Sequence, residues 1–294
     1  MHAEVAENMG QAVGDMILHH LTNGRQVELP FTSLDHLAGH AVGLPELPGF
    51  ELGGVRIELS LTKHVVMMLL AALLLLMMVW RVRRGLGLVP RGLANVVEAV
   101  VLFIRDDIAK GTMGPKAAEQ YTPYLCTTFF FIVTCNLIGL VPYGSTATGN
   151  LGVTATLAFM SFLLIQYAGI RELGVFGYLK HLIPPGVPFW LAPIMFLVEL
   201  LGVFAKPFAL CIRLFANMLA GHVVILSLIG LIFILGWIIA PVTVAFGVFM
   251  YVLELFVALL QAYIFTMLTS LFIGLLVAGH HADEHEEPSH GAKH

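Results

Sequence analysis

Charged residues are scarce in this sequence. Asp, Glu, Lys and Arg make up 12% of the 294 residues, whereas 58% are hydrophobic; soluble domains contain roughly 25% charged residues. The net charge is −4 and no large basic cluster occurs, which argues against nucleic-acid binding because phosphate contacts need many Lys or Arg on one exposed face. Gly-rich phosphate loops and nucleotide fingerprints are also missing. This composition predicts an integral membrane protein that binds neither nucleic acid nor nucleotide.

Cysteines are few as well. Cys126, Cys135 and Cys211 all lie in apolar segments, which is typical of small buried side chains and not of a disulfide framework or a metal site. The first residues lack the basic region and the long apolar region of a secretory signal. We therefore expect no metal, no cofactor and no cleaved leader.

Long apolar segments, in contrast, are abundant. A membrane-spanning helix needs about 20 mostly apolar residues, and the last two apolar segments are too long for one untilted crossing. The expected organisation is an N-terminal arm (1–62), a first transmembrane helix (63–84), an amphipathic surface helix (85–116), a transmembrane hairpin (117–170), a loop (171–188), two long helices (189–277) and a tail rich in His and acids (278–294). The sequence predicts an all-α integral membrane protein with five transmembrane helices and one amphipathic surface helix, the last two transmembrane helices being long and strongly tilted.

The segment 85–116 differs from the five spans in its pattern. Apolar residues alternate there at helical spacing with charged residues such as Glu98 and Lys110. A helix of this kind lies on the membrane surface with its apolar face inward. In the arm, a second short amphipathic helix is expected near Met9–Leu21.

Basic residues are distributed unevenly between the loops. The region 81–116 holds seven Lys or Arg and the loop 171–188 holds two, whereas 142–150 and 236–241 hold none. The positive-inside rule therefore places the first two regions in the cytoplasm. Five crossings then put the N-terminal arm outside and the C-terminal tail inside.

Polar residues interrupt the apolar run 189–234. An arginine at the centre of a membrane helix costs roughly 2.5–3.5 kcal/mol on insertion scales, so we expect Arg213 to line water, to meet a counter-charge, or both. At about 100° per residue, Lys206, Asn217 and Glu199 all lie within about 40° of Arg213 around the helix. A polar stripe inside lipid indicates water or another protein beside it.

The following helix carries Glu254 and Gln261 seven residues apart on one face. If it runs antiparallel to the preceding helix with Gln261 level with Arg213, Glu254 and His222 lie at similar depths. Ideal geometry turns His222 about 180° from Arg213, so His222 meets Glu254 only if the helix bends or His222 faces another neighbour. The sequence leaves this open.

These residue types suit proton transfer. Histidine and glutamate bind and release protons near neutral pH when a partner or burial tunes them. Arginine keeps its charge, and at ~4 Å and an effective dielectric near 20 it attracts a carboxylate by on the order of 4 kcal/mol. A fixed Arg213 would thus favour proton release from a passing carboxyl and block direct leakage between the two sides.

Two motifs resemble subunit a of the F-type ATP synthases. They are Lys206-Pro-Phe-Ala-Leu-Cys-Ile-Arg213-Leu-Phe-Ala-Asn217-Met-Leu-Ala-Gly-His222 and Glu254-Leu-Phe-Val-Ala-Leu-Leu-Gln261-Ala-Tyr-Ile-Phe265. Their combination is highly specific, and the five-crossing layout fits the family over the whole chain. Weaker agreement comes from Cys135-Asn136-Leu-Ile-Gly-Leu-Val-Pro142 in the hairpin.

The resemblance implies a role for each matching residue. Arg213 would be the essential arginine that faces the rotating ring of c subunits, and Glu199 would belong to the cytoplasmic half-channel. The positions tied to the outer half-channel are Asn217, His222, Glu254, Gln261 and, with weaker support, Asn136. Some bacterial members carry Glu at the position of His222 and His at that of Glu254, and the exchange leaves the individual roles of the two open. Lys206 matches a basic position for which a structural or interfacial role is expected.

The resemblance also implies a function and partners. The chain would be the stationary subunit of the F0 sector in the bacterial inner membrane, carrying protons through two offset half-channels to and from the c-ring carboxylates. Expected partners are the c-ring, the b-type peripheral stalk and, indirectly, the F1 sector, together with lipid and protons. The chain would not be an enzyme by itself but the proton-translocating subunit of an H+-transporting two-sector ATP synthase.

Three other functions stay open at this point. The same machine could be driven by Na+, because ion choice resides mostly in the ring. A self-contained secondary transporter is a second option, although the two halves of the chain show no repeat of the kind that many transporters have. A passive scaffold is the third.

Each candidate residue also has a purely structural interpretation. Arg213 could form an ion pair inside a helix bundle, and His222 with Glu254 could be a buried structural pair. Gln261 and Asn136 could hydrogen-bond across helices, and Glu199 could be an acid that reaches the membrane interface.

Overall fold

The computed structural model describes most of the chain. The residues described are 11, 14, 26–28, 41–43, 50–52, 55–57, 62–84, 92–141, 146–183, 187–188 and 190–283. The helix expected near 9–21 lies outside them apart from residues 11 and 14, and the tail lies outside them beyond residue 283.

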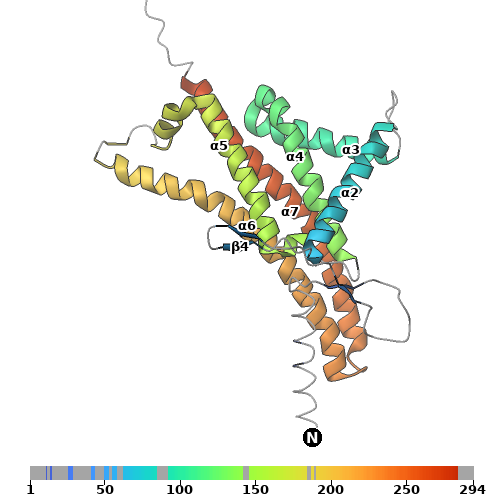
Figure 1. Ribbon diagram of the computed structural model, residues 1–294. Coiled ribbons are helices and arrows are strands. Elements are labelled where there is room, and N and C mark those ends of the chain that lie inside the picture. The colour runs from blue at the N-terminus through green and yellow to red at the C-terminus, as the bar shows by residue number, and fades with distance from the viewer. Residues whose placement is uncertain are drawn as a thin grey trace, which may run out of the picture. The chain divides into compact units, whose positions relative to one another are not determined.

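Helices dominate the described chain from residue 63 onward, and Figure 1 labels the longer ones. In order they are α2 (Lys63–Arg84), α3 (Leu93–Leu102), the π-helix η1 (Phe103–Ala109), α4 (Lys110–Leu140), the 3-10 helix η2 (Ala147–Gly149), α5 (Leu151–His181), α6 (Ala192–Leu235) and α7 (Ala240–Asp283). Four strands of three residues precede them, namely β1 (Gln26–Glu28), β2 (Ala41–Gly43), β3 (Phe50–Leu52) and β4 (Val55–Ile57). β1 pairs antiparallel with β2, and β3 with β4.

Five helical segments are long and apolar enough to cross a membrane. They are Lys63–Arg84, Leu93–Leu140, Leu151–Lys180, Ala192–Leu235 and Ala240–Val277. α6 and α7 contain 44 residues each, more than twice the about 20 that one perpendicular crossing needs. The expected class, an all-α integral membrane protein with five spanning helices of which the last two are long, is confirmed; the short strands lie in the arm.

Two helices are interrupted where glycine adopts a positive φ. In α4 the break is at Gly114, with φ 76°, and in α5 it is at Gly174, with φ 68°. Glycine tolerates this conformation because it has no Cβ. The segment expected as a surface helix over 85–116 therefore contains α3, η1 and the first residues of α4. After Gly174, α5 continues helically to His181, inside the segment 171–188 that was expected to be a connection.

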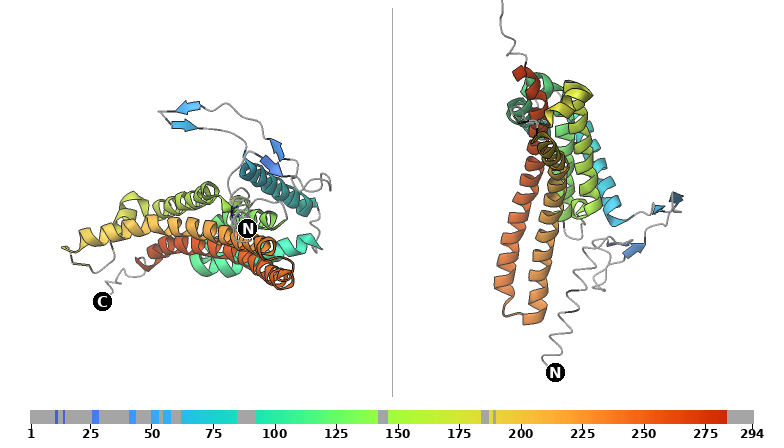
Figure 2. Two further views of the ribbon diagram at one scale, coloured as in Figure 1. Left: turned by 90° about the horizontal axis from the view of Figure 1, so that it is seen from below. Right: turned by 90° about the vertical axis from the view of Figure 1, so that its left-hand side faces the viewer.

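The described chain separates into two compact units. The first comprises Met1–Met78, Phe131–Thr154 and Ile212–Gln261. Within it the segments of α6 and α7 run side by side and antiparallel, as both views of Figure 2 show, and a short turn at 236–239 joins them. The first unit buries several polar side chains, among them Asn136, Thr148, Glu254 and Gln261. Such groups need partners, because burial without a hydrogen bond is costly.

The second unit comprises Val79–Phe130, Ala155–Cys211 and Ala262–His294. Its core is apolar and draws on η1, α4, α5 and α7; it includes Ile104, Ile108, Ala118, Tyr121, Leu125, Ile165, Ala168 and Ile273. The Thr112 and Ser270 hydroxyls hydrogen-bond at 2.5 Å and link α4 to α7.

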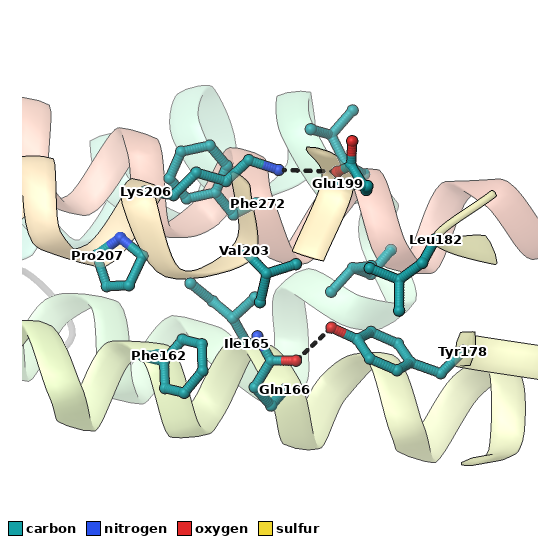
Figure 3. A pocket seen from close by; sticks show the side chains of 12 residues that line it. Phe162, Ile165, Gln166, Tyr178, Leu182, Glu199, Val203, Lys206, Pro207 and Phe272 are labelled. Atoms are coloured by element: carbon teal, nitrogen blue, oxygen red, sulfur yellow. Dashed lines mark hydrogen bonds and ion pairs between the residues drawn. The ribbon is translucent and has the colours of Figure 1, made fainter. Parts of the chain in front are cut away.

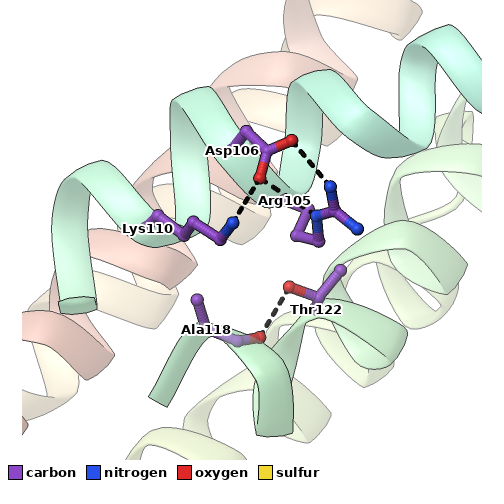
Figure 4. A network of polar contacts seen from close by, with 5 residues as sticks. All are labelled: Arg105, Asp106, Lys110, Ala118 and Thr122. Atoms are coloured by element: carbon purple, nitrogen blue, oxygen red, sulfur yellow. Dashed lines mark hydrogen bonds and ion pairs between the residues drawn. The ribbon is translucent and has the colours of Figure 1, made fainter. Parts of the chain in front are cut away.

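The exposed face of the η1 and α4 segment is charged. Asp106 pairs with Arg105 at 2.9 Å and with Lys110 at 2.7 Å (Figure 4). Close by, the hydroxyl of Thr122 donates to the carbonyl of Ala118 within α4. All three charged side chains are exposed.

Candidate functional site

The part of α6 that lies in the first unit buries one side and exposes another. Taking Arg213 as zero at about 100° per residue, Leu214 and Met218 lie at about 100° and 140°, and both are fully buried. Asn217 at about 40° and His222 at about 180° flank this buried side. Arg213 itself points away from it and is exposed.

The guanidinium of Arg213 has no ion pair and no hydrogen bond with any described residue. Its neighbours on the exposed side of α6 include Ala216, Asn217 and Ala220. Two of these three are small, so another helix could approach the arginine closely here. A cation in an apolar segment needs a counter-charge or water, and no described residue supplies a counter-charge here.

Asn217 and Gln261 link the two long helices within the first unit. The amide nitrogen of Asn217 donates to the Gln261 side-chain oxygen at 2.9 Å. Gln261 is 1% exposed, and its own amide nitrogen has no partner among the described residues. The register differs by one turn from the one considered from the sequence, in which Gln261 was level with Arg213.

His222 and Glu254 meet in the structure. The Nδ1 atom of His222 lies 3.4 Å from the Oε1 atom of Glu254. Glu254 is 3% exposed, and within the described chain neither of its carboxylate oxygens has a partner at hydrogen-bond geometry. The question left open by the sequence is thereby answered: α7 packs on the buried side of α6, which is flanked by Asn217 and His222, and Arg213 lies outside this contact.

Gly221 makes this approach possible. A Cβ atom at this position would lie 2.7 Å from the Oε1 atom of Glu254 and 2.8 Å from its Cδ atom. Real side-chain contacts of that length do not occur without displacement. The glycine before His222 therefore leaves room for the carboxyl group on α7.

Thr146, which the sequence did not single out, contacts His222 from the opposite side. Its hydroxyl hydrogen-bonds the Nε2 atom of His222, and Thr146 is itself buried. The imidazole is thus held by Thr146 on one ring nitrogen and lies within ion-pair distance of Glu254 on the other. The only signal in the sequence was a cluster of hydroxyl side chains in the uncharged loop between two spans.

Asn136 is enclosed by hydrogen bonds. Its amide nitrogen donates to the carbonyl of Ala258 at 3.1 Å, and its oxygen accepts from the Thr148 hydroxyl at 2.6 Å. Asn136 is completely buried. It ties α4, η2 and α7 together in the first unit, where Tyr251 adds a bond from its hydroxyl to the carbonyl of Leu140 at 2.5 Å.

Glu199 and Lys206 belong to the second unit. Their side chains form an ion pair at 3.5 Å and are 43% and 40% exposed. The Nζ atom of Lys206 also lies 5.4 Å from the centre of the Phe272 ring, a distance at which a cation is attracted to the ring. Exposed pairs of this kind contribute about 0–1 kcal/mol, so this one orients the two side chains more than it stabilises the fold.

No group of three or more His, Cys, Asp or Glu within the described ranges is placed to hold a metal ion. Comparison with known proteins connects this arrangement to a family.

The sequence model described as ATP synthase A chain matches residues 65–274. The chain is 49% identical over 294 residues to ATP synthase subunit a of Anaeromyxobacter dehalogenans, covering 97% of this chain and 76% of the relative. It is 53% identical over 256 residues to ATP synthase subunit a of Myxococcus xanthus, covering 85% and 84%. It is 49% identical over 282 residues to the same subunit of Chloroherpeton thalassium, covering 93% and 79%. A match of this extent means that the chain belongs to the ATP synthase A chain family.

Proposed function

We propose that this chain is the stationary half of a rotary proton translocator, in which two offset half-channels lead to and from the carboxylates of a c-ring and Arg213 separates them. Membership of the family supports a stator role in the F0 sector of an ATP synthase. The observation that carries the finer proposal is the exposed guanidinium of Arg213 within an apolar helix, which pairs with none of the residues that the structure describes.

Electrostatics gives Arg213 its role. The charge is permanent, and at ~4 Å and an effective dielectric near 20 it attracts a ring carboxylate by on the order of 4 kcal/mol. A protonated ring carboxyl that comes close is thereby favoured to release its proton. The same fixed charge repels protons that would otherwise pass from one half-channel to the other.

The buried cluster of the first unit supports an outer half-channel. Glu254 and His222 are both able to carry a proton, and Glu254 lacks hydrogen-bond partners among the described residues. Burying a carboxyl group is costly unless polar groups or water surround it, and His222 is the ion-pair neighbour that the described chain offers to Glu254. Asn217 on α6 and Gln261 on α7 continue the row of polar side chains from this pair toward Arg213.

Glu199 is the candidate for the other half-channel. Its carboxylate is partly exposed and lies on α6 two turns from Lys206. In this proposal a proton released near Arg213 leaves past Glu199 toward the cytoplasm. The ring, the b-type peripheral stalk and the F1 sector are the partners required, and each charge that crosses gains ~2.3 kcal/mol per 100 mV.

The test is replacement of Arg213 in the assembled synthase. Arg213→Ala in membrane vesicles should abolish ATP synthesis driven by an imposed proton gradient, while Lys180→Ala, which removes an exposed cation elsewhere, should leave it unchanged. Recovery of the complex with ring and stalk subunits shows that assembly survives. Retention of synthesis in an assembled Arg213→Ala complex would refute the proposal, and the same assay with and without Na+ at fixed pH identifies the coupling ion.

A further inference from the structure

The last segment of α5 exposes an apolar face. The helix leaves helical geometry at Gly174, with φ 68°, and continues from there to its end. In this segment, residues 174–181, Phe176 is 88% exposed, and Val175 and Leu179 are exposed as well. Residues one and four positions apart lie on the same side of a helix. The three side chains therefore form one surface, which we call the Phe176 face (Val175, Phe176 and Leu179).

The opposite face of the same segment is held against the rest of α5. The Tyr178 hydroxyl donates to the side-chain oxygen of Gln166 (Figure 3). The Tyr178 ring covers Gly169, where a Cβ would lie 2.9 Å from the Cε2 atom of the tyrosine. Leu182, one turn after Tyr178, is buried. These contacts fix the orientation of the segment, and the described chain leaves its Phe176 face uncovered.

The length of α5 before the break indicates the depth of this segment in the membrane. At 1.5 Å per residue, the stretch 151–173 is about 35 Å long, which exceeds the about 30 Å of the hydrocarbon core. α5 is therefore long enough to have completed its crossing where Gly174 turns the chain. Arg171 and Glu172 are exposed just before the break. Charges are costly inside hydrocarbon, so their position agrees with a membrane boundary at this point.

A second exposed aromatic side chain marks the other end of the connection. Trp190 lies two residues before α6 begins at Ala192 and is 75% exposed. Tryptophan is enriched at membrane–water interfaces. The chain therefore leaves α5 and enters α6 with a large apolar side chain exposed at each boundary.

We propose that the segment 174–181 is an interface anchor, which inserts its Phe176 face into the headgroup layer and the adjoining acyl region of the cytoplasmic leaflet. The layer that covers this face is lipid and not another subunit, because the break in α5 places the face at the depth of the leaflet surface and Trp190 marks the same boundary. The three apolar side chains leave water on insertion, which is favourable. Lys180 follows them and keeps its ammonium group in the water, as lysines near a membrane surface do.

The anchor needs little affinity of its own for the membrane. α5 and α6 tether the segment at both ends, so its insertion is an intramolecular step with a high effective concentration. A helix of this length without such tethers would bind lipid weakly, because binding strength scales with the buried apolar area. The anchor would hold the connection between the two helices at a constant depth.

Spin labelling in the assembled synthase tests for lipid at this face. A complex that is free of reactive cysteines and retains ATP synthesis is reconstituted in vesicles of phosphatidylethanolamine and phosphatidylglycerol. A nitroxide on Phe176→Cys is compared with one on Glu172→Cys, a matched exposed position before the break. Collision rates with oxygen, which prefers lipid, and with a water-soluble nickel chelate report the depth. We expect the label at position 176 to lie about 5–10 Å inside the headgroup boundary and the label at position 172 to be reached by the chelate.

Two results would overturn the proposal. If the chelate reaches both labels equally, the Phe176 face lies in water. If the label at position 176 is shielded from oxygen as well as from the chelate, another subunit covers the face. Leu179→Cys probes the same face by the same criteria if Phe176→Cys fails to assemble. The depth measurement does not depend on the role of Arg213, so either proposal can fail without the other.

Variants of Phe176 test whether this side chain drives the insertion. With the label on Leu179→Cys, the additional change Phe176→Ser should move the label out of the layer of about 5–10 Å, because less apolar surface leaves water. Phe176→Leu should preserve the depth. Phe159→Ser is the matched control, because Phe159 is an exposed phenylalanine in the part of α5 before the break. An unchanged depth in an assembled Phe176→Ser complex would overturn the assignment of the anchor to this side chain.

Discussion

Two cations lie seven residues apart on α6, and they differ in their surroundings. Lys206 has an acidic partner of its own chain and an aromatic ring beside it. Arg213 has no ion pair or hydrogen bond with any described residue and is exposed. Charges in a membrane segment are expensive and are retained when they meet a counter-charge. The comparison shows that Lys206 has a counter-charge within the described chain, whereas no described residue supplies one to Arg213, in keeping with the proposal that a ring carboxylate does.

Removing the charge of Arg213 or that of Lys206 should give the largest difference in ATP synthesis between two variants. Arg213→Gln should reduce gradient-driven ATP synthesis by about 10³-fold, because an interaction of on the order of 4 kcal/mol is lost. Lys206→Gln, which removes a pair worth about 0–1 kcal/mol, should cost less than about fivefold. The measurement is ATP synthesis in vesicles that contain equal amounts of assembled complex. Similar losses in the two variants would contradict the distinction between them.

Disrupting the buried pair of His222 and Glu254 should cause the second-largest loss of activity. Glu254→Gln keeps the shape of the side chain but cannot exchange a proton, and loss of a proton-transfer group typically costs about 10²-fold or more. Passive proton flux through the F0 sector, measured after removal of the F1 sector, isolates this step. Because residues in contact are coupled, the exchanged double variant His222→Glu with Glu254→His should recover part of the flux. A double variant as inactive as Glu254→Gln would argue that each residue acts separately.

A smaller loss is expected at Gly221. Gly221→Ala would place a Cβ 2.7 Å from the Glu254 carboxylate, and overpacking of this kind costs about 1–3 kcal/mol. We expect proton flux to fall about threefold to tenfold. Gly202→Ala is the matched control on the same helix, because a Cβ there meets no atom within 4 Å and alanine favours a helix. Equal flux in the two variants would mean that the approach of Glu254 to α6 is not needed.

The smallest loss is expected at Thr146. Thr146→Val removes the hydroxyl that holds His222 and preserves the shape, so that about 1 kcal/mol and roughly fivefold in flux are lost. Thr146→Ser should restore the flux because it returns the hydroxyl. Rescue by serine separates positioning of the imidazole from packing alone. A Thr146→Val complex with full flux would show that Glu254 suffices to place His222.

Several features were predictable from the sequence because they depend on local pattern. Five apolar segments predicted the five spanning helices, and the lengths of α6 and α7 follow from the lengths of their largely apolar runs. The candidate residues Arg213 and Glu254 were evident because charges inside such runs are rare. The break in α5 at Gly174 was not predicted, because the apolar and polar pattern continues through it.

The contacts of the site could not be derived in the same way. Helical periodicity placed His222 opposite Arg213, which is what the exposed and buried sides of α6 show. Periodicity could not say which side of α6 is covered by α7. The hydroxyl cluster around Thr146 was too weak a signal, because hydroxyl residues are common in loops.

The sequence by itself determined that this chain is a helical membrane protein whose last two helices carry Arg213, which keeps its charge, together with Lys206 and a few titratable groups. Charged and titratable side chains are costly to place in lipid and are therefore rare in membrane segments, so each one can be recognised from the sequence. Tertiary structure decided which of them meet. Only the packing of α7 against one flank of α6, permitted by the missing side chain at Gly221, brings Glu254 to His222 and leaves Arg213 exposed. Contacts between residues far apart in the chain depend on which helix faces come together, and local periodicity does not contain that information.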